Sequence, residues 1–183
     1  MNRTIRYLML SDIAILTGFG LISPILSIFI KDNIAGWTIF TAGMASTLYL
    51  ITKSIVQLPF SRYVDKHEKK KNILLIGTAL VIIVPFLYLV ATSIRHIYII
   101  QIFYGIGSGI AYPTWLGIRS LSLDKNNESF QRSMYSTAIG IGTAVAAAVG
   151  WALAQYAWYN VLFITIGMLS LIWALLLLKI ENK

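Results

Sequence analysis

Long apolar stretches separated by short polar connections fill almost the whole sequence. A helix that crosses a bilayer needs about 20 mostly apolar residues, and six stretches of that kind follow one another. They cover residues 7–30, 37–60, 72–92, 97–118, 133–157 and 159–179. Only two connections carry several charges, residues 61–71 and 119–132. The pattern predicts an all-α membrane protein with six transmembrane helices in a single domain, residues 1–183.

Composition supports this class and excludes others. Of the 183 residues, 57% are hydrophobic and 12% are charged, whereas charged residues make up about 25% of a typical soluble domain. The net charge of +8 does not indicate nucleic-acid binding, because the basic residues lie between apolar runs and form no continuous basic face. We therefore expect the lipid bilayer, and no nucleic acid, as a partner.

The sequence contains no constellation typical of a metal centre or an enzyme. There is no cysteine, which excludes disulfides and thiolate metal sites. His67 and His96 are the only histidines, and they fall in connections on opposite sides of the predicted membrane, so they share no metal or general-base site. Because no clear nucleophile and base pair is present, we expect no cofactor and no enzymatic activity.

The distribution of lysine and arginine predicts the orientation. Twelve of the fifteen lie in the N-terminus, in residues 61–71, in residues 119–132 and in the C-terminus. The alternate side has only Lys31 and Arg95. Since cytoplasmic connections carry an excess of basic residues, we expect a multi-pass protein of the plasma (inner) membrane with both termini in the cytoplasm.

Two segments share the spacing Gly-x-Gly-x-x-x-Pro. One runs from Gly18 to Pro24 in the first predicted span, and the other from Gly107 to Pro113 in the fourth. Because three spans separate them, they cross the bilayer in opposite directions, which is typical of an inverted repeat of three helices plus three. The repeats would cover about residues 1–92 and 95–183. The alternative is chance, since glycine and proline are common in membrane helices.

Small residues recur every four positions in the fifth predicted span. The main row contains Ala138, Gly142, Ala146, Gly150 and Ala154, and a second row beside it contains Gly140, Ala144, Ala148 and Ala152. Small residues let helix backbones approach closely in lipid, so we predict a packing face that includes Gly142, Ala146 and Gly150. The pattern leaves open whether its partner lies in the same bundle or in another subunit. A shorter row in the fourth span contains Gly105, Gly109 and Gly117.

Asp12 and Lys53 are the only formal charges well inside the predicted spans. Asp12 lies about five residues from the start of its span and Lys53 about eight from the end of the next, so both lie roughly 8–12 Å deep. Intramembrane charges are typical of functional sites, and these two could pair across adjacent helices, with Asp12 taking up a proton. The alternative is that Lys53 snorkels and Asp12 lies among the headgroups.

Polar residues also mark faces of two spans. Tyr49, Lys53 and Gln57 recur every four residues, so they share one face of the second helix. Gln101 and Tyr104 add polar positions to the fourth. We predict that these residues line a substrate path. The alternative is that they form hydrogen bonds between helices, as polar residues in membrane bundles commonly do.

The charged connection after the second span resembles a motif of a known family. Major facilitator superfamily transporters carry a loop that reads Gly-x-Leu-Ala-Asp-Arg-x-Gly-Arg-Arg/Lys. Asp65 falls at the aspartate of that loop, Lys66 at the following arginine, and Lys69 and Lys70 at the later basic pair.

The sequence departs from the family's pattern at several positions. Ser61 and Glu68 replace the two glycines of the loop, and Tyr63 replaces its leucine. Gln101 stands where the family's fourth-helix motif has an arginine, which weakens any inference of proton-driven drug antiport.

The resemblance implies one six-helix half of such a transporter. It also implies that the first and fourth helices line a central cavity, and that Asp65 gates the cytoplasmic side by contacting the other half. Arg62, Lys66, Lys69 and Lys70 would complete this gate. Because the sequence holds one six-helix unit, we expect a homodimer, a separate chain that supplies the second half, or an incomplete transporter.

Two functions remain open at this point. The first is a half-size secondary active transporter of an unknown small solute, with Asp12, Lys53 and Gln101 as candidates for the chemistry of the cavity. The second is a non-transporting membrane scaffold or truncated half that binds another protein through the small-residue face of the fifth span.

Overall fold

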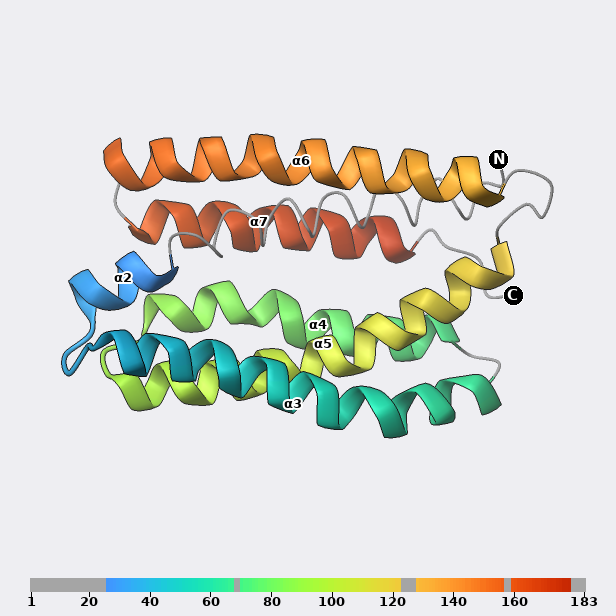
Figure 1. The fold of residues 1–183 in the computed structure, drawn as a ribbon, viewed down its shortest axis with the longest axis horizontal. Coiled ribbons are helices and arrows are strands. Elements are labelled where there is room, and N and C mark those ends of the chain that lie inside the picture. The colour runs from blue at the N-terminus through green and yellow to red at the C-terminus, as the bar shows by residue number, and fades with distance from the viewer. Residues whose placement is uncertain (1–25, 68–69, 123–127, 157–158, 179–183) are drawn as a thin grey trace.

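The computed structural model describes residues 26–67, 70–122, 128–156 and 159–178, and their long elements are all α-helices (Figure 1). The six helices are α2 (Leu26–Asn33), α3 (Ile39–Lys66), α4 (Lys70–Leu89), α5 (Ile94–Ser122), α6 (Glu128–Tyr156) and α7 (Tyr159–Leu178). The predicted all-α class is confirmed for these residues. Most of the first predicted span, with Asp12 and the segment from Gly18 to Pro24, lies outside them.

The five long helices run up and down along the long axis of the molecule (Figure 1). Helix α5 packs against both α3 and α4, α7 packs against α4, and α6 lies beside α7. Helix α2 lies at the end where α3 begins, which we call the α2 end. The last residues of α3 and α5 and the first residues of α4 and α6 therefore lie at the opposite end.

Within the described part of the chain, three helices are long and apolar enough to cross a membrane. They are α3, α4 and, over Ser129–Ala152, α6. Large apolar side chains on α3 face outward, and Ile39 is 82% and Leu58 73% exposed, as suits contact with lipid. Helix α5 has 29 residues but is not one of these three, and the crossing of the membrane by α5, by α7 and by the first predicted span stays a prediction.

Three helices extend beyond the ends predicted from the sequence. Helix α3 continues to Lys66 rather than Phe60, so Arg62, Asp65 and Lys66 lie on its last turns and not in a loop. Helix α5 continues to Ser122, and α6 begins at Glu128. An apolar run marks only the part of a helix that suits the hydrocarbon layer. Backbone hydrogen bonding does not stop there, and charged residues with long side chains are good helix formers.

The α2 end is tied together by several local contacts. The turn between α2 and α3 places Gly36 at a φ of +79°, a conformation that glycine adopts at no steric cost. Next to it, Ala35 forms a backbone bridge with Ser93 in the turn between α4 and α5. The Tyr159 hydroxyl of α7 donates a hydrogen bond of 2.7 Å to the carboxylate of Asp32 on α2.

The buried side chains form one cluster near each end of the bundle. Near the α2 end, Phe163 meets Phe29 edge to face at 4.9 Å between ring centroids and stacks on Tyr88 at 5.2 Å. Toward the other end, Trp115 of α5 lies 5.4 Å from Tyr135 of α6, measured between ring centroids. Aromatic pairs in these geometries stabilise beyond the area that they bury.

Glycines bring α5 into backbone contact with both of its neighbours. A Cβ atom at Gly105 would lie 2.7 Å from the Cβ of Thr52 on α3, and one at Gly109 would lie 2.8 Å from the Cβ of Val56. On the other side, a Cβ at Gly107 would lie 2.9 Å from the Cβ of Leu80 on α4. These distances are too short for real Cβ atoms, so the helices can pack this closely only because the residues are glycines.

The two rows of small residues on α6 lie on different sides of the helix. In the main row, Ala146 and Gly150 are buried and Gly142 is half-buried. The second row is exposed, and its members in the described part of α6 are Gly140, Ala144, Ala148 and Ala152. The row with Gly142, Ala146 and Gly150 therefore faces the protein's own bundle, while the second row faces outward.

Replacing Gly109 by alanine tests the contact between α3 and α5. The added Cβ would lie 2.8 Å from Val56 Cβ and 3.0 Å from the carbonyl oxygen of Lys53. Overpacking costs about 1–3 kcal/mol, which exceeds the gain of up to about 1 kcal/mol that alanine brings over glycine in a helix. We expect Gly109→Ala to lower the melting temperature of the purified protein in detergent.

Gly140→Ala is the matched control, because a Cβ there meets no atom within 4 Å. It keeps the gain in helix propensity without the clash, so its melting temperature should be unchanged or higher. Equal shifts in the two variants would mean that the glycine contact does not set the packing.

Candidate functional site

Lys53 lies close to the middle of α3. The helix has 28 residues, with fourteen before Lys53 and thirteen after it, so the residue is about 20 Å from either helix end at about 1.5 Å per residue. The predicted depth in the membrane, roughly 8–12 Å, was counted from Phe60 at the end of the apolar run, and the charged turns that α3 adds after Phe60 do not change it. Snorkelling toward the side of Phe60 therefore stays an alternative for Lys53.

The ammonium group of Lys53 lies against tyrosine rings. Its Nζ atom is 4.7 Å from the centre of the Tyr112 ring on α5 and 5.9 Å from that of Tyr49 on its own helix. Tyr49 in turn stacks on Tyr104 of α5 at 4.3 Å between centroids. We call Lys53, Tyr49, Tyr104 and Tyr112 the Lys53–tyrosine cluster.

The energetics leave this lysine only partly compensated. A charge inside a membrane span costs up to about 2.5–3.5 kcal/mol on insertion scales, the value for the centre of the span. A cation over an aromatic face recovers about 0.5–2 kcal/mol. In the described part of the chain no carboxylate pairs with Lys53, and Asp12, the predicted partner, lies outside it. The cluster therefore holds a positive charge that further negative charge would stabilise.

The tyrosine hydroxyls add hydrogen-bonding groups to the cluster. The Tyr104 hydroxyl has hydrogen-bond partners in Tyr49 and in Ser108 of the same helix. Tyr112 is 44% exposed and Lys53 is half-buried, so the cluster has an accessible side. Gln57, one turn after Lys53 on α3, is also half-buried.

The contact between Lys53 and Tyr112 is the feature that the sequence did not predict. A signal for it was present, since Tyr104, Ser108 and Tyr112 recur every four residues on α5, as Tyr49, Lys53 and Gln57 do on α3. What periodicity does not provide is the register between the two rows. Gly105 and Gly109 set that register by the close approach of α5 to α3.

Gln101 adjoins the Lys53–tyrosine cluster through Tyr88, which interacts electrostatically with Tyr49 and Tyr104. It is 3% exposed, and its Nε2 atom donates a hydrogen bond of 3.1 Å to the hydroxyl of Tyr88 on α4. The amide is therefore committed to the contact between α4 and α5. The predicted grouping of Gln101 with Lys53 in cavity chemistry stays a prediction.

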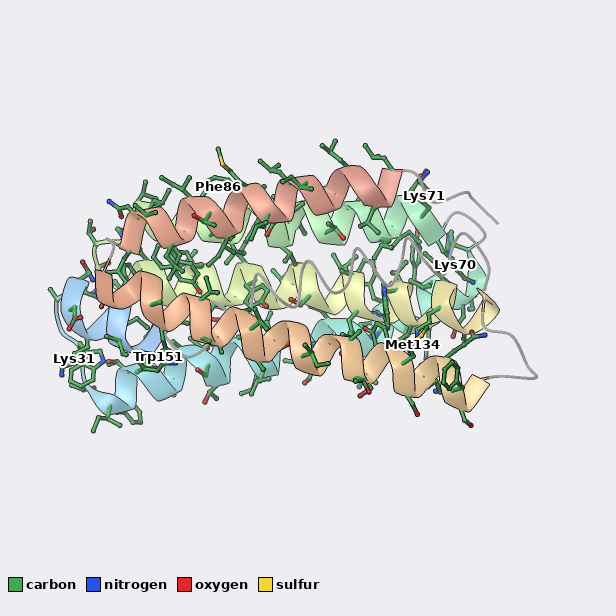
Figure 2. All side chains as sticks on the ribbon, turned by 90° about the horizontal axis from the view of Figure 1, so that it is seen from above. Lys31, Lys70, Lys71, Phe86, Met134 and Trp151 are labelled. Atoms are coloured by element: carbon green, nitrogen blue, oxygen red, sulfur yellow. The ribbon has the colours of Figure 1, made fainter. Side chains whose placement is uncertain are left out.

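Basic side chains gather at the end of the bundle opposite α2. Lys70 and Lys71 lie at this end and Lys31 at the other (Figure 2). Arg62 and Lys66 are exposed on the last turns of α3, and Asp65 is exposed between them. We call this the basic end. Lys69, also predicted for the gate, lies outside the described residues.

Two of the cations at the basic end join helices. The Nζ atom of Lys71 donates a hydrogen bond of 2.8 Å to the carbonyl of Leu178, the last residue of α7, where a cation also complements the helix dipole. The guanidinium of Arg119 on α5 lies 3.8 Å from the centre of the Tyr135 ring on α6 and 5.0 Å from that of Trp115. The sequence predicted neither contact.

Comparison with known families identifies the chain. A family model described as Major Facilitator Superfamily matches residues 8–183. The chain belongs to this superfamily. The match includes every helix of the structure, and major facilitator proteins are transporters rather than enzymes. A search of curated proteins finds no match. Among the described residues, no group of His, Asp or Glu side chains could hold a metal ion in this major facilitator protein.

The bond between Gln101 and Tyr88 gives a test of the contact between α4 and α5. Tyr88→Phe removes the hydroxyl that accepts from the buried amide. Hydrogen bonds between membrane helices contribute about 0.6 kcal/mol on average and up to about 1.7 kcal/mol, so we expect a loss within this range. Unfolding titrations with a denaturing detergent measure it.

Tyr98→Phe is the control, because Tyr98 is half-buried and the described residues include no hydrogen-bond partner for its hydroxyl. The double variant Tyr88→Phe with Gln101→Leu completes a thermodynamic cycle. Strictly additive losses would show that the two side chains do not interact.

Proposed function

We propose that this chain is a secondary active transporter that moves a small solute by alternating access. Membership of the superfamily supports transport as the activity. The observation that carries the proposal is the Lys53–tyrosine cluster, which places charge and hydroxyl groups near the middle of a membrane-capable helix. Polar groups at that depth are costly, and they are typical of substrate and ion pathways.

A second six-helix bundle completes the transporter in this proposal. Alternating access needs two bundles that rock about a shared site. Two copies related by an axis along the membrane normal would reproduce the parallel relation between the two halves of a major facilitator transporter. A separate chain that supplies the second bundle is the alternative.

Asp65 is the proposed gate residue of this assembly. Its carboxylate is exposed on the last turn of α3, next to Lys66 and one turn from Arg62. Lysine and arginine residues keep such an end in the cytoplasm, and a carboxylate adds nothing to that effect. Asp65 therefore needs another explanation. We propose that Asp65 contacts the second bundle on the cytoplasmic side of the plasma (inner) membrane, where both termini would also lie.

A non-transporting scaffold is the second candidate. It is favoured by the exposed row of small residues on α6, which offers another membrane helix a surface for close approach. A scaffold has no need of a charge inside a membrane span, which is why we place it second.

The number of bundles in the particle separates these candidates. We expect native mass spectrometry from lipid nanodiscs to give two copies of the 20.4 kDa chain, or one copy with a second bundle of another sequence. A stable single copy that has no partner would contradict the transporter, since one bundle cannot alternate about a shared site.

Replacing Asp65 by asparagine tests the gate. We expect Asp65→Asn to insert into membranes normally and to weaken association of the two bundles by about tenfold, or about 1.4 kcal/mol, because a charge-assisted contact is lost. Association can be measured by energy transfer between labelled copies in liposomes. Asp65→Glu keeps the charge and should restore most of the association. Full association of the Asp65→Asn variant would mean that this segment only sets the orientation of the protein in the membrane.

A further inference from the structure

We propose that the Lys53–tyrosine cluster binds the carboxylate group of a small organic anion. This inference rests on the proposed transport function and adds the chemical class of the solute. It follows from three properties of the cluster: its charge, its hydroxyl groups and its accessible side.

The charge favours an anion. The Nζ atom of Lys53 lies 4.7 Å from the ring of Tyr112 and 5.9 Å from that of Tyr49. Aromatic faces stabilise the ammonium group but do not neutralise it. A bound anion inside the span would therefore gain more from this charge than it would in water, whereas a cationic solute would be repelled.

The hydroxyl groups favour an oxygen acceptor. A carboxylate accepts several hydrogen bonds and a tyrosine hydroxyl donates one. Tyr112 and Tyr49 both lie beside the ammonium group, and the Tyr104 hydroxyl interacts with Tyr49 and Ser108. Hydrogen bonds to charged groups are roughly twice as strong as neutral ones, so the same hydroxyls contribute more with a carboxylate than with a neutral solute.

The number of cations favours a carboxylate over a phosphate. The cluster contains one ammonium group and no arginine. A single ammonium matches the charge of one carboxylate, whereas proteins commonly recognise phosphate with paired donors such as the fork of arginine. Tyr112 is 44% exposed, so a ligand whose body extends away from the charged group can reach the cluster from this side.

Binding of benzoate to the full chain in lipid nanodiscs tests the proposal. Saturation-transfer NMR follows benzoate, neutral benzamide and cationic benzylammonium, which share a ring and differ in charge. We expect saturable binding of benzoate that neither analogue displaces. Lys53→Gln should weaken it by about tenfold or more, and Lys53→Arg should keep it within about threefold, as expected for a charge-assisted contact.

Lys31→Gln is the matched control, because Lys31 also lies over an aromatic ring, that of Trp37 at 6.0 Å, but at the α2 end of the bundle. Its benzoate binding should equal that of the unmodified chain. Circular dichroism establishes that each variant is folded. If Lys53→Gln does not fold, two other measurements decide the outcome. They are the selectivity of the unmodified chain for benzoate over benzamide and the affinity of Lys53→Arg for benzoate.

Three results would overturn the proposal: no benzoate binding at millimolar concentration, equal binding of benzamide, or binding that Lys53→Gln leaves unchanged. Absence of benzoate binding is also the result expected if Asp12 already neutralises Lys53. None of these results concerns the number of bundles or Asp65. If the carboxylate proposal fails, association of two bundles would therefore still indicate a transporter, with another class of solute.

Discussion

The close approach of α5 to its two neighbours is the constraint on which the rest of the structure depends. Gly105 and Gly109 bring α5 against α3, and Gly77 and Gly107 bring it against α4, so that a single added Cβ would overlap atoms of the neighbouring helix. In lipid, association of helices depends on such packing because apolar burial provides no drive. These contacts fix three helices in one register.

That register determines the chemistry of the candidate site. With α5 seated on α3, Tyr104 stacks on Tyr49 and Tyr112 lies over the ammonium of Lys53. A carboxylate in the place of these rings would neutralise the lysine and leave little for a ligand. Tyrosine faces stabilise the charge without neutralising it, which suits the proposed binding and release of a solute.

The helices were largely predictable from the sequence, and their contacts were not. Apolar runs located the described helices, because the hydrocarbon layer requires such runs. They misplaced the end of α3, since Arg62 and Asp65 continue the helix beyond the apolar part, and so they put Lys53 nearer to a helix end than it is. Four-residue spacing predicted that Tyr49, Lys53 and Gln57 share one face of α3. Which residue of α5 contacts Lys53 depends on how closely the two helices approach each other. Periodicity along the sequence does not give that distance.

The distribution of contacts also suits movement of the bundle as one unit. At the α2 end, Tyr159 bonds to Asp32 and Ala35 to Ser93. At the basic end, Lys71 joins α4 to α7. Alternating access is largely rigid-body rocking of one bundle against another, so contacts within a bundle should persist while those between bundles change. Lys53 lies inside the part held by glycine contacts, whereas the carboxylate of Asp65 is exposed on the same helix. A solute bound at Lys53 would thus move with α3, and the same movement would make or break the contact at Asp65.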